Sequence, residues 1–396
     1  MSGTGGMVSP QHARLATMAA FFVNGGAMAA WAANIPSVRE HLGLSETTLG
    51  FALLGIAVGS VSALSIAGRL SARYGSRAVV IATAIPTILL VPALIAAPSL
   101  LLLVLALLAF GFCISLMDVA MNAHGVLVEQ RLGRPIMSSL HALWSAGSLV
   151  GAGGVTLLLR TGMTPLTYAL LAASVLAVLA LVALPRLLPS TFDRGAAGDD
   201  RPTFVLPRGP LLGIAALALL AFVAEGAIAD WSAVYIRDAL NTDRGLAAGG
   251  FVAFNLAMFA ARLFGDPIRE RYSAAALLRG GGVLAALGIA LALLASTPAL
   301  AFVGFALSGL GLSNVVPVLF SAAGALPGVS AATGVAAAAS AGYAGFLIGP
   351  PIIGVLAGVF TLKVALILVV VFAALIAIAA GTVRHAQPVG AAPAVH

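Results

Sequence analysis

The chain has 396 residues, of which 61% are apolar and only 8% charged, so the remaining polar side chains are too few to solvate the surface of a soluble fold of this length. This composition excludes a soluble protein and predicts an integral membrane protein. The net charge of +7 does not require a nucleic-acid partner, because membrane topology accounts for the arginines.

Twelve apolar stretches follow one another along the chain, each about 20 residues long, which is the length at which an α-helix crosses a bilayer. A transmembrane β-barrel would show short runs of alternating apolar and polar residues, whereas residues 101–117 are continuously apolar. We therefore predict an all-α membrane protein of twelve transmembrane helices. They begin near Arg14, Ser45, Arg77, Ser99, Pro135, Pro165, Pro210, Gly245, Ser273, Pro298, Val329 and Thr361.

The basic residues predict the orientation of the chain. With the N-terminus inside, 15 of the 20 Lys and Arg residues lie on the cytoplasmic side and 5 outside, which agrees with the excess of positive charge in cytoplasmic loops. We expect a multi-pass protein of the cytoplasmic (inner) membrane with both termini in the cytoplasm. Residues 29–34 resemble a signal-peptide cleavage site, but we expect no cleavage because the same residues recur deep in the chain.

The first predicted helix has a second copy two hundred residues later. The sequence FVNGGAMAAW at residues 22–31 returns as FVAEGAIADW at residues 222–231, with the aromatic and small residues in register. Shorter echoes at a spacing of 198 link residues 147–151 with 345–349. The chain is thus predicted to contain two six-helix repeats of the same orientation around a central cavity.

The repeat divides the chain into three predicted parts. These are an N-terminal six-helix bundle at residues 1–186, a cytoplasmic linker at 187–209, and a C-terminal six-helix bundle with a short cytoplasmic tail at 210–396. The linker combines proline, glycine and charges of both signs, and we expect it to be flexible or poorly packed. Pairs of glycines within helices, such as Gly147 and Gly151, predict either close helix packing or helices that pivot during a transport cycle.

The connection between the second and third predicted helices, GRLSARYGSR at residues 68–77, resembles the signature loop of the major facilitator superfamily. The family pattern has an aspartate where this chain has Ala72. In the family such loops gate the cytoplasmic side through charge pairs and helix-end contacts. The resemblance implies this role for Gly68, Arg69, Arg73, Gly75, Arg77, Arg262, Gly265 and Asp266.

Two more features resemble the family. Glu129, with Arg134 five residues later, matches its acid-to-arginine pattern at the end of the fourth helix, which adds both residues to the gate and makes Glu129 an acceptor for Arg69 or Arg73. A second set is similar to a bacterial subgroup distantly related to fucose permeases, which includes proteins associated with rhizopine metabolism. This set contains Trp31, Ile35, Pro36, the motifs at 42–45 and 49–50, Met137, Ser138, His141, Ser145 and residues 225–232. The resemblance implies a secondary transporter.

Four polar or small residues of the fourth predicted helix lie on one stripe, because they are spaced by four, three and four: Asp118, Asn122, Gly125 and Glu129. An ionised carboxylate near the middle of the membrane costs about 2.5–3.5 kcal/mol, so the stripe is expected to face the cavity. Asp118 and Asn122 are then candidates for binding protons or substrate. The alternative for Asp118 is a structural hydrogen bond to a neighbouring helix.

Three further titratable residues are candidates for proton coupling or substrate binding. His141 on the fifth helix either relays protons with Glu129 or Asp118, or is a neutral histidine bonded to a backbone carbonyl. Glu225 lies deep in the seventh helix, where it serves as a coupling or substrate-binding acid. Asp230 lies near the outer end of the same helix as a substrate ligand, a solvated vestibule charge or a partner of Arg237.

Aromatic rings next to amides and acids suit sugars and polyols, because the rings stack on apolar sugar faces while polar groups bond the hydroxyls. The outer tryptophans have an alternative role in the membrane-interface belt, and the amides an alternative role at helix kinks. Predicted cavity residues are Asn24, Trp31, Trp144, Trp231, Asn255, Asn314 and Tyr343.

No pattern of an enzyme is found: histidines are not paired at metal-binding spacing, and there is no Walker loop for ATP. We expect no cofactor and no metal, and the predicted partners are protons, a small-molecule substrate and the lipid bilayer, with the chain a monomer. The sequence predicts a proton-coupled transporter of a small polar solute, such as a sugar, polyol or amino-sugar-like compound. The alternatives are a drug or metabolite exporter working by proton antiport, and a non-transporting membrane receptor or assembly protein.

Overall fold

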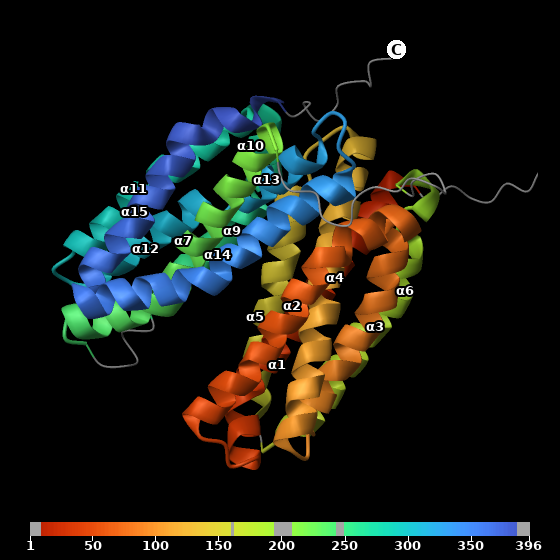
Figure 1. The fold of residues 1–396 in the computed structure, drawn as a ribbon, viewed down its shortest axis with the longest axis horizontal. Helices are drawn as coiled ribbons and strands as arrows, with labels where there is room; N and C mark the ends of the chain where they lie inside the picture. The colour runs from red at the N-terminus through yellow and green to blue at the C-terminus, as the bar shows by residue number, and fades with distance from the viewer. Residues whose placement is uncertain (1–8, 160–161, 194–207, 243–248, 386–396) are drawn as a thin grey trace, which may run out of the picture. The chain divides into compact units, whose positions relative to one another are not determined.

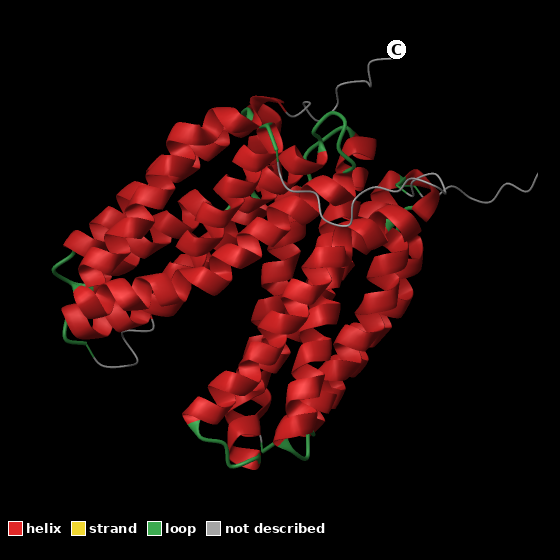
Figure 2. Ribbon diagram, viewed as in Figure 1, coloured by secondary structure: helices red, strands yellow, loops and turns green. Residues whose placement is uncertain are grey.

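A computed structural model describes the chain except for residues 1–8, 160–161, 194–207, 243–248 and 386–396. The described residues form helices and loops and contain no strand (Figure 2). Figure 1 shows the helices in chain order. The long ones are α1 (Pro10–His41), α2 (Glu46–Tyr74), α3 (Ser76–Ile95), α4 (Leu100–Leu132), α5 (Met137–Leu159), α6 (Pro165–Ala183), α7 (Pro210–Ala239), α9 (Gly249–Leu263), α11 (Ala274–Leu294), α12 (Pro298–Leu312), α14 (Ala331–Val359) and α15 (Leu362–Ile378).

Shorter elements interrupt or join these helices. They are α10 (Gly265–Arg271), α13 (Val315–Gly324) and the 3-10 turns η1 (Leu184–Arg186), η2 (Ser190–Phe192) and η3 (Ala379–His385). Within the described residues, ten helices are long and apolar enough to cross a membrane, and the pair α9 and α10, bent by 55°, makes an eleventh span. The helix α5, with 23 residues, completes the predicted set of twelve.

Helix starts follow the local sequence chemistry. Proline occupies the first turn of α1, α6, α7 and α12, where its missing N–H leaves no bond unmade. A serine or threonine hydroxyl caps α2, α4, α12 and α15 by accepting a backbone N–H. These two signals explain why most predicted starts lie within a few residues of the observed ones.

The chain forms two compact units that exchange short segments. The first contains residues 1–133, 140–205 and 330–336, and the second contains residues 134–139, 206–329 and 337–396. The start of α5 therefore belongs to the second unit, and the start of α14 to the first. The division at residues 187–209 stays a prediction.

The two units share most of their internal helix packing. In the first, α1 packs against α3, α4 and α6, and α4 packs against α2 and α3. In the second, α7 packs against α9, α13 and α15, and α12 packs against α9 and α11. Under the sequence repeat, α1–α4 corresponds to α7–α13, α1–α6 to α7–α15, and the packing of α4 on α2 and α3 to that of α12 on α9 and α11. The pairs α1–α3 and α7–α9 have no such counterpart among the described residues, so the two bundles repeat most but not all of their helix contacts.

Glycines allow the helices to touch backbone to backbone. In the first unit a side chain at Gly147 would overlap the Phe22 carbonyl, and one at Gly151 would place its Cβ 2.6 Å from the Gly26 oxygen. In the second unit Gly345, the repeat partner of Gly147, has the same relation at 2.6 Å to the Leu219 oxygen. These contacts are too close for any side chain, which supports the packing role of the glycine pairs.

Candidate functional site: polar clusters inside the two units

The first unit holds a polar cluster on α4 and α5. The Asn122 amide nitrogen lies 3.3 Å from Asp118 Oδ1 and donates to the Asp118 backbone oxygen at 2.9 Å. His141 Nε2 is 3.1 Å from Asn122 Oδ1. Because the amide nitrogen is used toward Asp118, the amide oxygen accepts and His141 Nε2 carries the proton. The structure thus brings together Asp118, Asn122 and His141, with the asparagine as the bridge between acid and histidine.

A second polar contact ties α1 to α4 and α5 in the same unit. Trp144 Nε1 donates to Asn24 Oδ1 at 2.9 Å, while Asn24 Nδ2 donates to the Ile114 backbone oxygen at 3.0 Å. The amide of the buried Asn24 therefore has both ends bonded. The Phe21 ring meets His141 edge-on, with ring centres 5.3 Å apart. The predicted cavity residues Asn24 and Trp144 are thus bonded to each other, and Phe21, on the same helix as Asn24, contacts His141 of the Asp118 cluster.

The second unit holds a buried ion pair. Glu225 Oε2 on α7 lies 3.8 Å from Arg262 Nη2 at the end of α9, with the two side chains 14% and 7% exposed. Arg262 Nε also donates to the Ser313 backbone oxygen at 3.0 Å. Glu225 Oε1 is buried and has no hydrogen-bond partner among the described residues. This unbonded oxygen is a vacant acceptor for a donor group inside an apolar bundle.

Arg262 therefore has a different setting from the one predicted. It was expected at the gate with Gly265 and Asp266, whereas it contacts Glu225 in the middle of α7 and the Ser313 backbone oxygen. The helix breaks at Phe264, between Arg262 and Asp266, and the bend separates their directions. The gate role of Arg262 stays a prediction.

Asp266, in the second unit, binds the start of α5. Its Oδ1 accepts the backbone N–H groups of Ser138 at 2.9 Å and Ser139 at 3.2 Å, and Oδ2 accepts that of Ser139 at 3.1 Å. The first N–H groups of a helix have no intrahelical acceptor, and the helix dipole favours an anion there. Gly265 must be small, because a side chain on it would overlap Asn314 and Ser138.

The corresponding loop of the first unit makes different contacts. Gly68 lies against the start of α14, where a Cβ on it would meet Ala336 at 3.2 Å. Arg69 and Arg73 are exposed, and the Arg73 guanidinium lies 5.3 Å from the Tyr74 ring centre. Gly75, with φ of 83°, ends α2, and Arg77 donates to the Pro185 backbone oxygen at 2.9 Å.

Glu129 and Arg134, the predicted gate residues at the end of the fourth helix, differ in their exposure to solvent. Glu129 is buried at 1% exposure, whereas Arg134 is exposed. Asp230 is also exposed, and Arg237, its predicted alternative partner, pairs through Nε with Asp238 at 2.8 Å. Adjacent residues at the frayed end of α7 bring that pair together. The role of Asp230 stays a prediction.

The remaining predicted cavity residues have varied environments. Trp31 is 1% exposed, with a buried Nε1 that has no acceptor among the described residues. Trp231 lies beside Gly354, and Tyr343 stands 6.0 Å from the Phe222 ring centre. Asn255 is exposed and bonds back to Phe251, and Asn314 Nδ2 donates to Ser313 Oγ at 3.0 Å. Whether these residues line a cavity stays a prediction.

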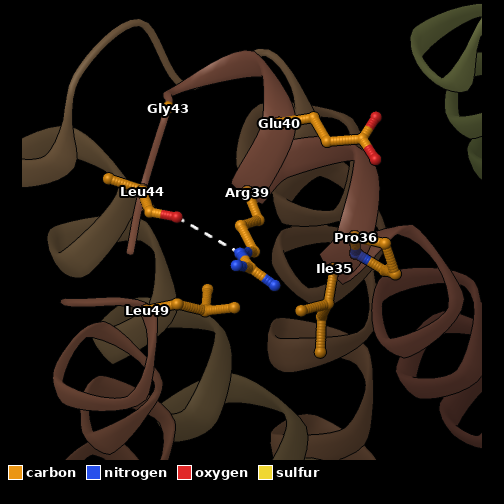
Figure 3. A pocket seen from close by; sticks show the side chains of 7 residues that line it. All are labelled: Ile35, Pro36, Arg39, Glu40, Gly43, Leu44 and Leu49. Atoms are coloured by element: carbon orange, nitrogen blue, oxygen red, sulfur yellow. Dashed lines mark hydrogen bonds between the residues drawn. The ribbon is translucent and has the colours of Figure 1, made fainter. Parts of the chain in front are cut away.

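Two features of the first unit were not predicted. Both ring nitrogens of His124 are hydrogen bonded, to Ser76 Oγ and to the Leu188 N–H. A hollow of about 510 Å³ lies where α1 ends and α2 begins, lined by Ile35, Pro36, Arg39, Glu40, Gly43, Leu44 and Leu49. Figure 3 shows Arg39 reaching across this hollow to the Leu44 backbone oxygen, 3.2 Å away.

Comparison with known proteins places this fold. The family model of the Major Facilitator Superfamily matches residues 17–342. The chain belongs to the major facilitator superfamily. An uncharacterized MFS-type transporter of Yersinia pestis is 40% identical over 89% of this chain and 91% of its own, and the membrane protein MosC of Rhizobium meliloti is 34% identical over 91% of this chain and 87% of its own.

Among solved structures, the superfamily transporter FucP in its outward conformation matches with a TM-score of 0.77 and 15% identity, over 93% of this chain and 97% of FucP. A second structure, of a FucP variant with one substitution, describes FucP as the E. coli fucose:proton symporter. The likeness shows the fold, so this superfamily member has the twelve-helix MFS fold. It is a multi-pass membrane transporter.

Proposed function

We propose that this superfamily member is a proton-coupled secondary transporter of the cytoplasmic membrane, with both termini in the cytoplasm. Its solute is small and polar: a sugar, a polyol or an amino-sugar-like compound. The transporter works as a monomer by alternating access, and its energy comes from a proton gradient. The observation that carries the proposal is a set of acids kept inside apolar helical bundles, one on α4 and one on α7.

The acid of the first unit is arranged for exchange of a proton or a hydroxyl ligand. Asp118 is part-exposed, and Asn122 supplies one donor to its carboxylate. His141 Nε2 lies 3.1 Å from the oxygen of the same Asn122 amide, so an imidazole stands next in the chain of bonds. Acid, amide and imidazole in sequence offer both acceptors and donors, which is the chemistry that binds a polyhydroxylated solute.

The acid of the second unit adds a charged element. A buried carboxylate beside a guanidinium is stable while both are charged, and removing either charge leaves the other without compensation. Glu225 Oε1 is open to a donor, which a solute ammonium or hydroxyl supplies, or a proton. Binding of a proton or a cationic group at Glu225 therefore changes the charge balance around Arg262. We assign this change as the coupling step.

FucP supports the proposal by analogy only, because a fucose:proton symporter shares this fold. An exporter working by proton antiport uses the same buried acids in the opposite direction, and a receptor or assembly protein has no need of them. A transport assay therefore decides between uptake and export. Variants of the two acids decide against or for the receptor alternative, because a receptor would not need the acids.

The test is solute uptake into proteoliposomes under an imposed pH gradient, across a panel of sugars, polyols and aminated derivatives. The wild type is compared with Asp118→Asn and Glu225→Gln, and Asp238→Asn is the control because Asp238 is an exposed acid paired with its neighbour. We expect Asp118→Asn and Glu225→Gln to lose gradient-driven uptake and the control to keep it. Unchanged uptake with an unchanged pH response in both variants would show that these acids have no coupling role.

A further inference from the structure

The chain that directly follows α6 is folded and packed against the first unit. Residues 184–193, here called the strap, run through the turns η1 and η2 along the end of the first unit where α2 meets α3. Leu187 and Leu188 are fully buried there, with 0% and 2% exposure. Residues 187–193 of the strap lie in the segment predicted to be a flexible or poorly packed linker, and they are packed.

Polar contacts fix the strap along its length. Arg77 donates to the Pro185 oxygen at 2.9 Å, and the Leu188 N–H donates to His124 Nε2 at 3.1 Å. Because Nε2 accepts, the His124 proton is on Nδ1, which donates to Ser76 Oγ at 2.8 Å. The Arg131 guanidinium lies 3.8 Å from the Phe192 ring centre, a cation–π contact.

The strap ends on the first turn of α3. Asp193 Oδ2 accepts the Ser76 backbone N–H at 2.9 Å. This N–H belongs to a helix whose cap residue is Gly75, which has no side chain to accept it. In the second unit the equivalent helix, α11, is capped by its own Ser273. A side chain on Gly75 would overlap Ser190, so the same glycine that removes the local cap makes room for the strap.

We infer that Asp193 is a positioning residue that caps α3 from the linker, so that the strap holds the loop at residues 68–77 in place. His124 serves as the second fixed point, in its neutral form. The inference concerns the linker and the loop, and it stands whether or not Asp118 and Glu225 couple protons.

The charge of Asp193 sets the direction of a pH effect. Burial raises its pKa above the ordinary aspartate value, and the bonds to Ser76 offset this in part. The packed strap therefore binds a proton more tightly than a released one. Linkage makes packing strongest below the ordinary pKa and weaker as the pH rises through the raised pKa. The charged or titratable side chains of the bundle that contact the strap directly are Arg77, Arg131 and the neutral His124.

The test is hydrogen–deuterium exchange of the full-length protein, read on peptides covering residues 184–193. Asp193→Ala removes the cap and is expected to speed exchange of the strap by roughly five- to tenfold, the factor that a side-chain cap of a helix is worth. Asp238→Ala, which removes an exposed acid elsewhere, is the control and leaves the strap unchanged.

A second variant separates the cap from the charge. Asp193→Asn keeps an oxygen that accepts the Ser76 N–H and is neutral at all pH values. We expect a strap protected at least as well as in the wild type, with the pH response above the ordinary aspartate pKa abolished after correction for intrinsic exchange. Wild-type exchange in Asp193→Ala overturns the inference, as does an asparagine variant that is as unprotected as the alanine variant.

Discussion

The first helices of the two repeats, α1 and α7, start from nearly the same ten residues and end in different chemistry. On α1, Gly25 lies against the backbone of α5, where a side chain would overlap the Trp144 carbonyl. On α7, the equivalent residue is Glu225, which pairs with Arg262 of α9. One position therefore serves backbone packing in the first unit and holds a buried charge in the second.

A shift between helices makes the difference possible. Gly147 of α5 touches the Phe22 oxygen, and repeat symmetry would bring Gly345 of α14 to Phe222. Gly345 instead touches Leu219, three residues earlier, which is about 4.5 Å along a helix axis. Because α14 contacts α7 about one turn earlier than α5 contacts α1, position 225 does not lie against a backbone as Gly25 does. The two repeats share one fold, and the register between α7 and α14 leaves room for the Glu225 side chain.

The ion pair is the largest expected energetic difference between the two helices. Glu225→Gln leaves Arg262 charged and buried, and we expect a loss of about 3–5 kcal/mol of stability. Adding Arg262→Gln removes the uncompensated charge and is expected to recover most of that loss. Thermal unfolding of the purified single and double variants measures this. Equal destabilisation by the single and double variants contradicts a charge effect.

The glycine contact is next in size. Gly25→Ala places a methyl group on the Trp144 carbonyl, so α1 and α5 must separate, and we expect a loss of about 1–3 kcal/mol. Gly153→Ala, on α5 with no atom near its Cβ, is the matched control. It is expected to be neutral or slightly stabilising, because alanine favours helix. Melting temperatures of both variants decide, and equal values contradict the packing role of Gly25.

The smallest effect concerns the amide that only the first repeat has. Asn24 holds Trp144, whereas the second repeat has Ala224 and Gly342 at these places. Trp144→Phe removes one hydrogen bond and is expected to lower stability by about 1 kcal/mol. Asn255→Ala removes only a bond to its own helix at an exposed position and is expected to change little. Melting temperatures of both variants test this. If Trp144→Phe lowers the melting temperature no more than Asn255→Ala, the hydrogen bond between Trp144 and Asn24 does not stabilise the fold.

The sequence predicts the fold well because its signals are local. Continuous apolar runs mark the spans, and proline, serine and threonine mark the helix starts, so Pro165, Pro210 and Pro298 are at once predicted and observed starts. The spacing of Asp118 and Asn122 on one face likewise predicted their contact, since one helical turn brings residues four apart together.

Contacts between distant segments could not be read in the same way. Nothing in the spacing links Glu225 to Arg262, because the bend after α9 and the shifted register of α14 decide what reaches that level. Asp193 meets Ser76, and Leu188 meets His124, only because the chain after α6 folds back onto the bundle. The one available signal was Gly75, whose lack of a side chain leaves the start of α3 without a cap of its own.

The most direct test of the coupling claim follows protons and solute together. Solute is added to lightly buffered proteoliposomes, and external pH and solute exchange at equal concentrations are recorded. We predict that solute entry raises the external pH in the wild type, and that Glu225→Gln combined with Arg262→Gln keeps some solute exchange but abolishes the pH change. A full pH change in that double variant and in Asp118→Asn would contradict the account.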